Sequence, residues 1–135
     1  MSVRISHTTI YVLDQERAKA FYTEKLGFEV HDDVRMGNFR WLTVAPRDQA
    51  DVLLILMPLD ESSPMDAETV TTLRQLVEAG KLGAAVLETK DCRKTYEELS
   101  ARGVVFRGPP VERPYGIEAI LRDDSNNWFS LTQRR

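Results

Sequence analysis

The chain repeats one order of secondary-structure signals twice, and this duplication limits the folds that its 135 residues can adopt. A short alternating strand, a helix and three further strand-like runs occupy the first half, and the same order returns in the second half. Two glycines of the kind that end helices, Gly27 and Gly103, lie 76 residues apart. The same offset carries His7, in the first strand, to Gly83 at the opening of the second half. We therefore predict two related modules, each too small to bury a good core alone.

The first module is predicted to span about residues 1–59. Its opening run, Ile5–Val12, is rich in the β-branched and aromatic residues that favour strands. Asp14 stands where its carboxylate caps the helix that follows, and Gly27 provides the left-handed residue that ends this helix. Three further strands are expected near residues 28–34, 39–45 and 51–57, with turn-type residues between them.

The second module is predicted to span about residues 82–135. It begins with the strand-like run Gly83–Thr89, and Asp91 is expected to cap a helix that ends at Gly103. Its later strands are expected near residues 104–106, 117–122 and 128–132. A linker helix over about residues 62–80 joins the modules, because apolar residues recur there at helical spacing.

These elements predict an α+β fold in which the whole chain, residues 1–135, forms one domain. The two βαβββ modules are expected to pair into a curved mixed sheet, with helices on its outer face and a cleft inside. A cleft of this kind is a common place for a small ligand.

The composition and charge predict a cytoplasmic protein that binds neither nucleic acid nor a membrane. The net charge is −3, and no extended basic run is present to follow a phosphate backbone. The longest apolar run, Val52–Met57, is too short to span a bilayer, and the N-terminus lacks the pattern of a signal peptide. The single cysteine, Cys92, cannot form an internal disulfide and is expected to be an inert thiol at the start of a helix.

Short motifs in a fixed order cover nearly the whole chain: His7–Val12 with Asp14, Phe21-Tyr22, Leu26–Phe28, Tyr96 with Leu99, Gly103-Val104, Tyr115-Gly116 and Arg122–Leu131. Together they resemble the vicinal oxygen chelate superfamily, which includes glyoxalase I, extradiol dioxygenases and bleomycin-resistance proteins. In the last motif, asparagines replace the glycine common in the family's closing turn, and asparagine tolerates the same left-handed conformation. The resemblance implies the fold predicted above and a homodimer whose clefts are completed by both chains.

The resemblance also implies where a metal ion would bind in a metal-dependent member. Such members take ligands from the first and fourth strands of each half, with His, Glu, His and Glu or close variants. At the 76-residue offset, the corresponding positions are His7, Leu54, Gly83 (or its neighbour Ala84) and Ser130. Leucine and glycine supply no side-chain ligand, and a neutral serine hydroxyl is a poor one. We therefore predict no resident metal ion and no other cofactor, with His7 the only retained residue of ligand type.

Strand alternation then assigns side chains to the cleft or to the core. If His7 faces the cleft, Ile10 and Val12 face the helices; if Ser130 faces it, Phe129 fills the core. The predicted ligand-binding residues line the cleft or enter it from a loop: His7, Thr9, Tyr11, Phe39, Trp41, Leu54, Leu56, Tyr115, Glu118, Trp128 and Ser130. This pocket is mostly apolar and aromatic with a few polar groups, which suits an organic molecule.

Several of these side chains also admit a structural interpretation. His7 is either a hydrogen-bonding or acid–base group in the cleft or a buried neutral histidine bonded to a backbone carbonyl. Trp41 is either a platform for a ligand ring or an ordinary packing residue. The neighbouring Arg40 is expected to be exposed, and Glu118 either binds a ligand cation or pairs with Arg122, four residues along on the same face of its strand.

The sequence supports three hypotheses of function, of which the first is preferred. The first is a metal-free binding protein that binds or sequesters an apolar or aromatic compound, as resistance-type members of the superfamily do. The second is a lyase, isomerase or dioxygenase that uses His7 and Glu118 with a divalent metal or as an acid–base pair. The third is an interaction protein whose pocket is filled by side chains and whose helix near residues 64–79 contacts a partner.

Overall fold

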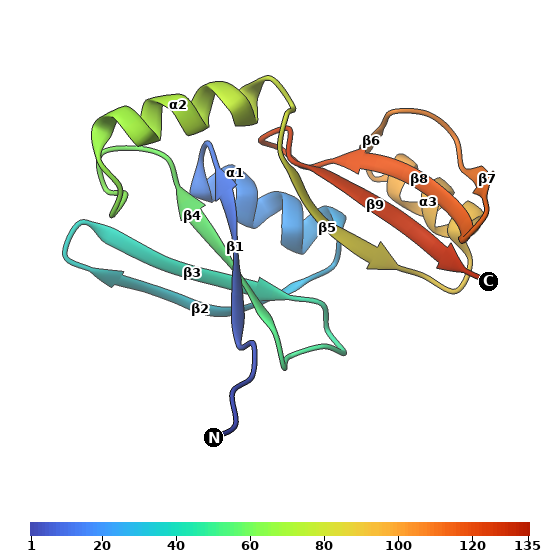
Figure 1. Ribbon diagram of the computed structural model, residues 1–135, viewed down its shortest axis with the longest axis horizontal. Coiled ribbons are helices and arrows are strands. Elements are labelled where there is room, and N and C mark those ends of the chain that lie inside the picture. The colour runs from blue at the N-terminus through green and yellow to red at the C-terminus, as the bar shows by residue number, and fades with distance from the viewer.

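The computed structural model describes residues 1–135 as two β-sheets set side by side with helices behind them (Figure 1). The first half of the chain builds a four-stranded sheet, and the second half builds a five-stranded sheet. Helix α2 (Ala67–Glu78) runs along the top of Figure 1 and connects the two halves. The α+β class and the two modules predicted from the duplication are confirmed.

The first sheet has the strand order β1-β4-β3-β2. Its module contains β1 (His7–Val12), α1 (Gln15–Ala20), a π-helical turn η1 (Phe21–Lys25), β2 (Glu29–Met36), β3 (Phe39–Ala45) and β4 (Leu53–Pro58). β1 pairs with β4 in parallel, whereas the other pairs are antiparallel, so β1 and β2 point the same way. The helix between them is the crossover that this arrangement requires. Asp14 caps α1 by accepting the Arg17 N–H at 2.9 Å, and Gly27, with a φ of 75°, ends the helical segment.

The second sheet repeats this topology with the order β5-β9-β8-β6. Its module contains β5 (Gly83–Glu88), α3 (Cys92–Ala101), β6 (Val105–Phe106), β7 (Val111–Arg113), β8 (Gly116–Arg122) and β9 (Trp128–Arg134). Asp91 caps α3 by accepting the Lys94 N–H at 3.1 Å, and Gly103 ends it with a φ of 90°. The short strand β7, which pairs with β8, was not predicted, because prolines flank it on both sides.

One hydrophobic core lies between the sheets and the helices and includes residues of both modules. Tyr22 of η1 is fully buried, and its ring contacts Phe28 of the first module and Phe129 of the second. Ile10 and Val12 of β1 belong to this core, as their predicted phase requires. Each module therefore buries apolar area that it could not bury alone.

The turn between β8 and β9 fastens the second module to the first. The hydroxyl of Ser125 accepts the backbone N–H of Leu13 at 2.9 Å. The side-chain amide of Asn127 donates to the carbonyl of Tyr11 at 2.7 Å. Asn126 adopts a φ of 79°, so an asparagine does take the left-handed position of this turn, as predicted.

Helix α2 packs over one end of the first sheet. The carboxylate of Asp66 caps its first turn, and Val70 and Val77 are buried against Leu59. Tyr11 of β1 packs against this small cluster. None of the helices in the chain combines the length and the apolar character needed to cross a membrane.

The predicted phase of β4 is wrong. Leu56 is fully buried in the shared core and pairs with Ile10, a core residue, while Leu54 packs against the same core. Leu56 and Leu131 are both buried in this core and lie 75 residues apart, an odd number, so an offset of 76 assigns one of the two strands the wrong phase. A shift of one residue moves every side chain of a strand to the opposite face. The β4 residues that share the face of His7 are instead Leu53, Ile55 and Met57.

Candidate ligand-binding site

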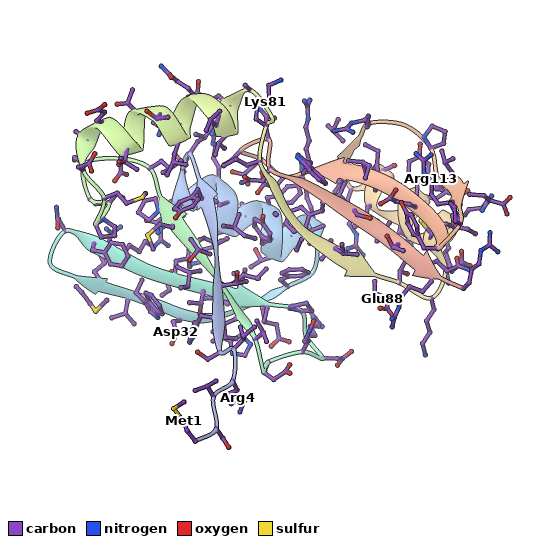
Figure 2. The ribbon with its side chains drawn as sticks, in the orientation of Figure 1. Met1, Arg4, Asp32, Lys81, Glu88 and Arg113 are labelled. Atoms are coloured by element: carbon purple, nitrogen blue, oxygen red, sulfur yellow. The ribbon has the colours of Figure 1, made fainter.

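Each sheet has one face packed on helices and one open face, and the open faces carry most of the predicted ligand-binding residues. In Figure 1, β8 and β9 lie in front of α3, so their open face points towards the viewer. Asp32 of β2 and Glu88 of β5, both labelled in Figure 2, belong to the open faces of the first and second sheets. The side chains of the two open faces differ in chemistry.

The open face of the first sheet is built around two rings. The centroids of the His7 and Trp41 rings lie 5.6 Å apart, with the planes tilted by 52°. The Nδ1 atom of His7 lies 2.8 Å from the hydroxyl of Ser6. His7 is partly exposed and bonded to a hydroxyl, so its interpretation as a buried histidine bonded to a carbonyl is wrong. Thr9 is exposed beside Ile55, its partner on β4.

Phe39 and Trp41 share this open face, while Arg40 between them points to the helix side, as alternation predicts. The expected exposure of Arg40 is wrong, because only 7% of the residue is accessible. Its Nε donates to Asp33 at 2.7 Å, and its guanidinium also pairs with Glu16 of α1. The pKa of Asp33 is lowered, mainly because Arg40 donates hydrogen bonds to it. Arg40 therefore holds the sheet to the helix and is not available to a ligand.

The side chains of the first open face do not form a set of metal ligands. The nearest neighbours of His7 are the indole of Trp41 and, on β4, Leu53. With the corrected phase, Ile55 replaces Leu54 as the fourth-strand position, and neither residue carries a donor atom. Across the chain, no three side chains of His, Cys, Asp or Glu gather closely enough to hold a metal ion. The donors present therefore do not fit a resident divalent metal.

In the second module, an indole covers Gly83, one of the two positions at which the resemblance would place a metal ligand. The ring of Trp128 lies across Gly83, so a Cβ atom at Gly83 would lie 2.6 Å from Cζ2 of the indole. Real Cβ atoms do not approach another atom so closely, and any residue larger than glycine would displace the ring. Gly83 thus supports an aromatic platform of which 36% is exposed.

A polar network occupies the middle of the second open face. The Tyr115 hydroxyl donates to Oε1 of Glu118 at 2.7 Å, and the Ser130 hydroxyl donates to Oε2 at 2.5 Å. The hydroxyls of Ser130 and Thr132 are 2.7 Å apart, which extends the network along β9. These bonds, that of Ser130 first, lower the pKa of Glu118, so its carboxylate is ionised at neutral pH. The nearest cation is Arg113, with its Nε 3.7 Å from Oε1.

Glu118 contacts neither Arg122 nor His7, the two residues with which it was predicted to interact. Pairing with Arg122 is wrong, because Arg113 from β7 is the cation beside Glu118 and Arg122 forms no ion pair. No hydrogen bond or ion pair joins Glu118 to His7 within the chain, so the proposed acid–base pair has no direct contact. Binding of a ligand cation by Glu118 stays a prediction.

A cavity of about 270 Å³ opens at the end of the second sheet nearest α2. Trp128 lies in its wall, and strand pairing places Arg122 beside Trp128 and Val105 beside Arg122. The other apolar residues around it are Ile120, Ala79, Leu121 and Phe106, and the Phe106 side chain lies on the helix side of β6. Sequence reasoning missed Val105 and Phe106, because β6 has only two residues and a strand so short has no alternation to interpret.

The structure therefore brings the predicted residues together in three groups. His7 and Trp41 meet on the first face, Tyr115, Glu118 and Ser130 meet on the second, and Trp128 belongs to the cavity. The ligand-binding role of all these residues stays a prediction.

Comparison with known sequences identifies related proteins whose similarity extends over nearly the entire chain. The sequence model of the Glyoxalase/Bleomycin resistance protein/Dioxygenase superfamily matches residues 4–131. The uncharacterized protein YurT of Bacillus subtilis (strain 168) is 34% identical over 133 residues, which are 98% of this chain and 100% of that protein.

Comparison with solved structures gives a similar result. The crystal structure of UcmS2 superimposes with a TM-score of 0.93 at 50% identity, over 98% of this chain and 99% of the other. TnmS3, an antibiotic binding protein from Streptomyces sp. CB03234, superimposes with a TM-score of 0.77 at 30% identity, over 99% and 98% of the two chains.

Proposed function

Because the chain belongs to the glyoxalase/bleomycin resistance protein/dioxygenase superfamily, we propose that it binds or sequesters an apolar or aromatic compound without a resident metal ion. The observation that carries this proposal is the indole of Trp128, which lies on Gly83 in the space that a metal-ligating side chain would need. The likeness to TnmS3, an antibiotic binding protein, supports a binding role. Its ligand would be an organic molecule of antibiotic type with an aromatic part.

The open faces supply the surface for such a ligand. Trp41 and Trp128 offer flat rings, and a buried aromatic pair is worth about 0.5–1.5 kcal/mol beyond its apolar area. The hydroxyl and carboxylate groups around Glu118 give a ligand hydrogen-bonding partners of fixed position. This combination of apolar walls and a few placed polar groups is typical of small-molecule sites.

We propose further that the binding clefts form between two copies of the chain. Strand pairing places Val34 and Met36 on the first open face and Val86 on the second, and they are 52%, 55% and 67% exposed. Large apolar side chains exposed on both open faces favour surfaces that are covered by a partner. A homodimer that sets one open face over another would bury them and enclose the ligand.

The experiment that tests binding uses the two tryptophans as reporters. The metal-free protein is titrated with 2-naphthamide, a neutral bicyclic probe, while tryptophan fluorescence is recorded with and without EDTA. Saturable quenching that EDTA leaves unchanged, with an affinity at least about tenfold weaker in Trp128→Leu, is expected. Leu76→Ala, an exposed apolar residue of α2, is the matched control and should bind normally.

Two results would overturn the proposal. One is binding that requires a stoichiometric metal ion retained through purification, which would favour a lyase, isomerase or dioxygenase. The other is the absence of any saturable response to aromatic probes, which would favour the interaction protein. Sedimentation of the native chain and of Val86→Lys tests the dimer separately: a monomer in both would contradict it.

A further inference from the structure

The cavity beside Trp128 differs from the rest of the open faces in shape and charge. Its volume of about 270 Å³ is close to the lower end of ligand pockets, about 300 Å³, and suits one flat bicyclic group. It lies between the end of α2 and strands β6, β8 and β9, away from the Glu118 network. It is thus a separate part of the surface that the proposed function uses.

The apolar walls of this cavity are fixed in position. The indole of Trp128 rests on Gly83, which leaves its outer face accessible to a second ring. Ile120 lies on the same face of β8 as Arg122, which pairs with Trp128, and its side chain is partly buried. Val105 is 50% exposed at the mouth. A flat aromatic group placed here would contact side chains that are already ordered, so little conformational entropy would be lost on binding.

The charges around the cavity are not balanced. Arg107 and Arg122 line it, and neither side chain takes part in a hydrogen bond or an ion pair. The one carboxylate in the lining, that of Glu78, already faces Arg74, with Oε1 3.7 Å from a guanidinium nitrogen. Arg122 also borders a neighbouring hollow that contains Asp124, yet no ion pair joins the two. The cavity therefore presents two unpaired guanidinium groups beside an aromatic platform.

We propose that this cavity binds a flat aromatic compound that carries a carboxylate, with the ring on Trp128 and the carboxylate between Arg122 and Arg107. Guanidinium groups match the two oxygens of a carboxylate, and each such charged hydrogen bond contributes more than a neutral one. The inference rests on the proposed binding function and adds the ligand class: an aromatic carboxylate is preferred over its neutral counterpart at this site.

The test compares two probes of almost identical shape. 2-Naphthoate and 2-naphthamide are titrated into the native protein by calorimetry, and the two indole N–H signals are followed by ¹H–¹⁵N NMR. The chain has only two tryptophans, so one Trp128→Phe variant assigns both signals. We expect 2-naphthoate to bind at least about tenfold more tightly, to shift the Trp128 signal more than that of Trp41, and to weaken as salt is added.

The Arg122→Gln variant should remove most of this preference and leave the affinity for 2-naphthamide unchanged. Arg35→Gln, which removes an exposed arginine of β2 far from the cavity, is the control and should keep the preference. The inference is overturned if the native protein binds both probes equally. It is also overturned if the double variant Arg122→Gln/Arg107→Gln keeps the full preference for 2-naphthoate over 2-naphthamide. If aromatic probes shift only Trp41, the proposed function stands and this inference fails; if neither tryptophan responds to any probe, both fail.

Discussion

The two modules are alike on the side that faces the helices and different on the side that faces away from them. On the helix side, Leu56 of the first module and Leu131 of the second are buried in one shared core. On the open side, the first sheet presents His7 against Trp41, whereas the second presents the Glu118 network and the Trp128 cavity. After a duplication, packing constrains the core side of both copies equally, and the open side is free to change its chemistry.

This contrast between the open faces is also the basis on which we propose that the chain binds its ligand without a metal ion. At the 76-residue offset, the position corresponding to His7 of the first module is Gly83 or its neighbour Ala84 in the second. In the first module, His7 is a residue that can bind a metal ion, and its ring contacts Trp41. In the second module, the indole of Trp128 fills the space above Gly83.

The largest effect is expected from truncating the shared core. Leu56→Ala and Leu131→Ala should each lower the free energy of unfolding by about 2–5 kcal/mol, because each leaves a cavity among buried side chains. Denaturant titration measures both. Ile55→Ala, the open-face neighbour of Leu56, is the control and should lose clearly less. Equal losses for Leu56→Ala and Ile55→Ala would contradict the corrected phase of β4.

The phase of β4 is also the part of the fold that the sequence did not predict correctly. The order of elements, the capping residues Asp14 and Asp91 and the left-handed Asn126 were predictable, because each depends on local chemistry. The phase of β4 was carried over from the other module by a single offset, and the modules differ by one residue at this strand. Because adjacent residues of a strand face opposite sides of the sheet, a shift of one residue moves every side chain of the strand to the wrong face.

Contacts in the candidate site could be predicted only between residues that lie on one strand or on two regularly paired strands. Trp128 and Ser130 were placed on one open face by alternation within β9, and this agrees with the pairing of β8 with β9. The contact of Trp128 with Gly83 and the wall formed by Val105 depend on how separate strands approach one another. No periodicity in the sequence reports such distances.

Gly83→Ala is the variant that most directly tests the difference between the open faces. The added Cβ would meet the indole of Trp128 at 2.6 Å. Because the ring is partly exposed, it can swing away, so we expect a loss of about 1–3 kcal/mol in stability and at least about tenfold in affinity for aromatic probes. Gly108→Ala, where nothing lies within 4 Å, is the control for both measurements. Normal probe binding by Gly83→Ala would exclude the indole platform.

The polar network of the second face should contribute a smaller and pH-dependent amount. Ser130→Ala removes the main bond that lowers the pKa of Glu118 and should destabilise the protein by about 1–2 kcal/mol at pH 7. A lowered pKa stabilises the fold above the unfolded value, about 4.3, and this stabilisation disappears as the pH falls through the folded value. The difference between wild type and variant should therefore shrink as the pH falls below about 4.3. Ser130→Thr, which keeps a hydroxyl, serves as the control.

Asp124, in the turn that joins the modules, should behave in the opposite way. Burial, followed by the charge of Asp123, raises its pKa to about 6, and its Oδ1 has no hydrogen-bond partner. Ionised Asp124 therefore destabilises the folded state. This destabilisation is zero below about pH 4, grows as the pH rises, and reaches its full size above about pH 6. Asp124→Asn should raise stability by about 1 kcal/mol at pH 7, after allowance for its partial exposure, and by nothing at pH 4. The exposed Asp48→Asn is the control, and an equal gain at both pH values would be contrary to this account.

The smallest effect on stability is expected at His7, although the position is the one that marks metal-dependent relatives. Its ring is partly exposed and contacts only Trp41 and the Ser6 hydroxyl, so His7→Phe should change the free energy of unfolding by less than about 0.5 kcal/mol. Phenylalanine keeps the ring contact and removes both nitrogens. If the open faces bind an organic ligand without a metal, probe binding should persist in this variant. Abolished binding together with the loss of a retained metal would show that the donor set is completed by groups outside this chain, and the contrast between the two faces would then describe half a metal site.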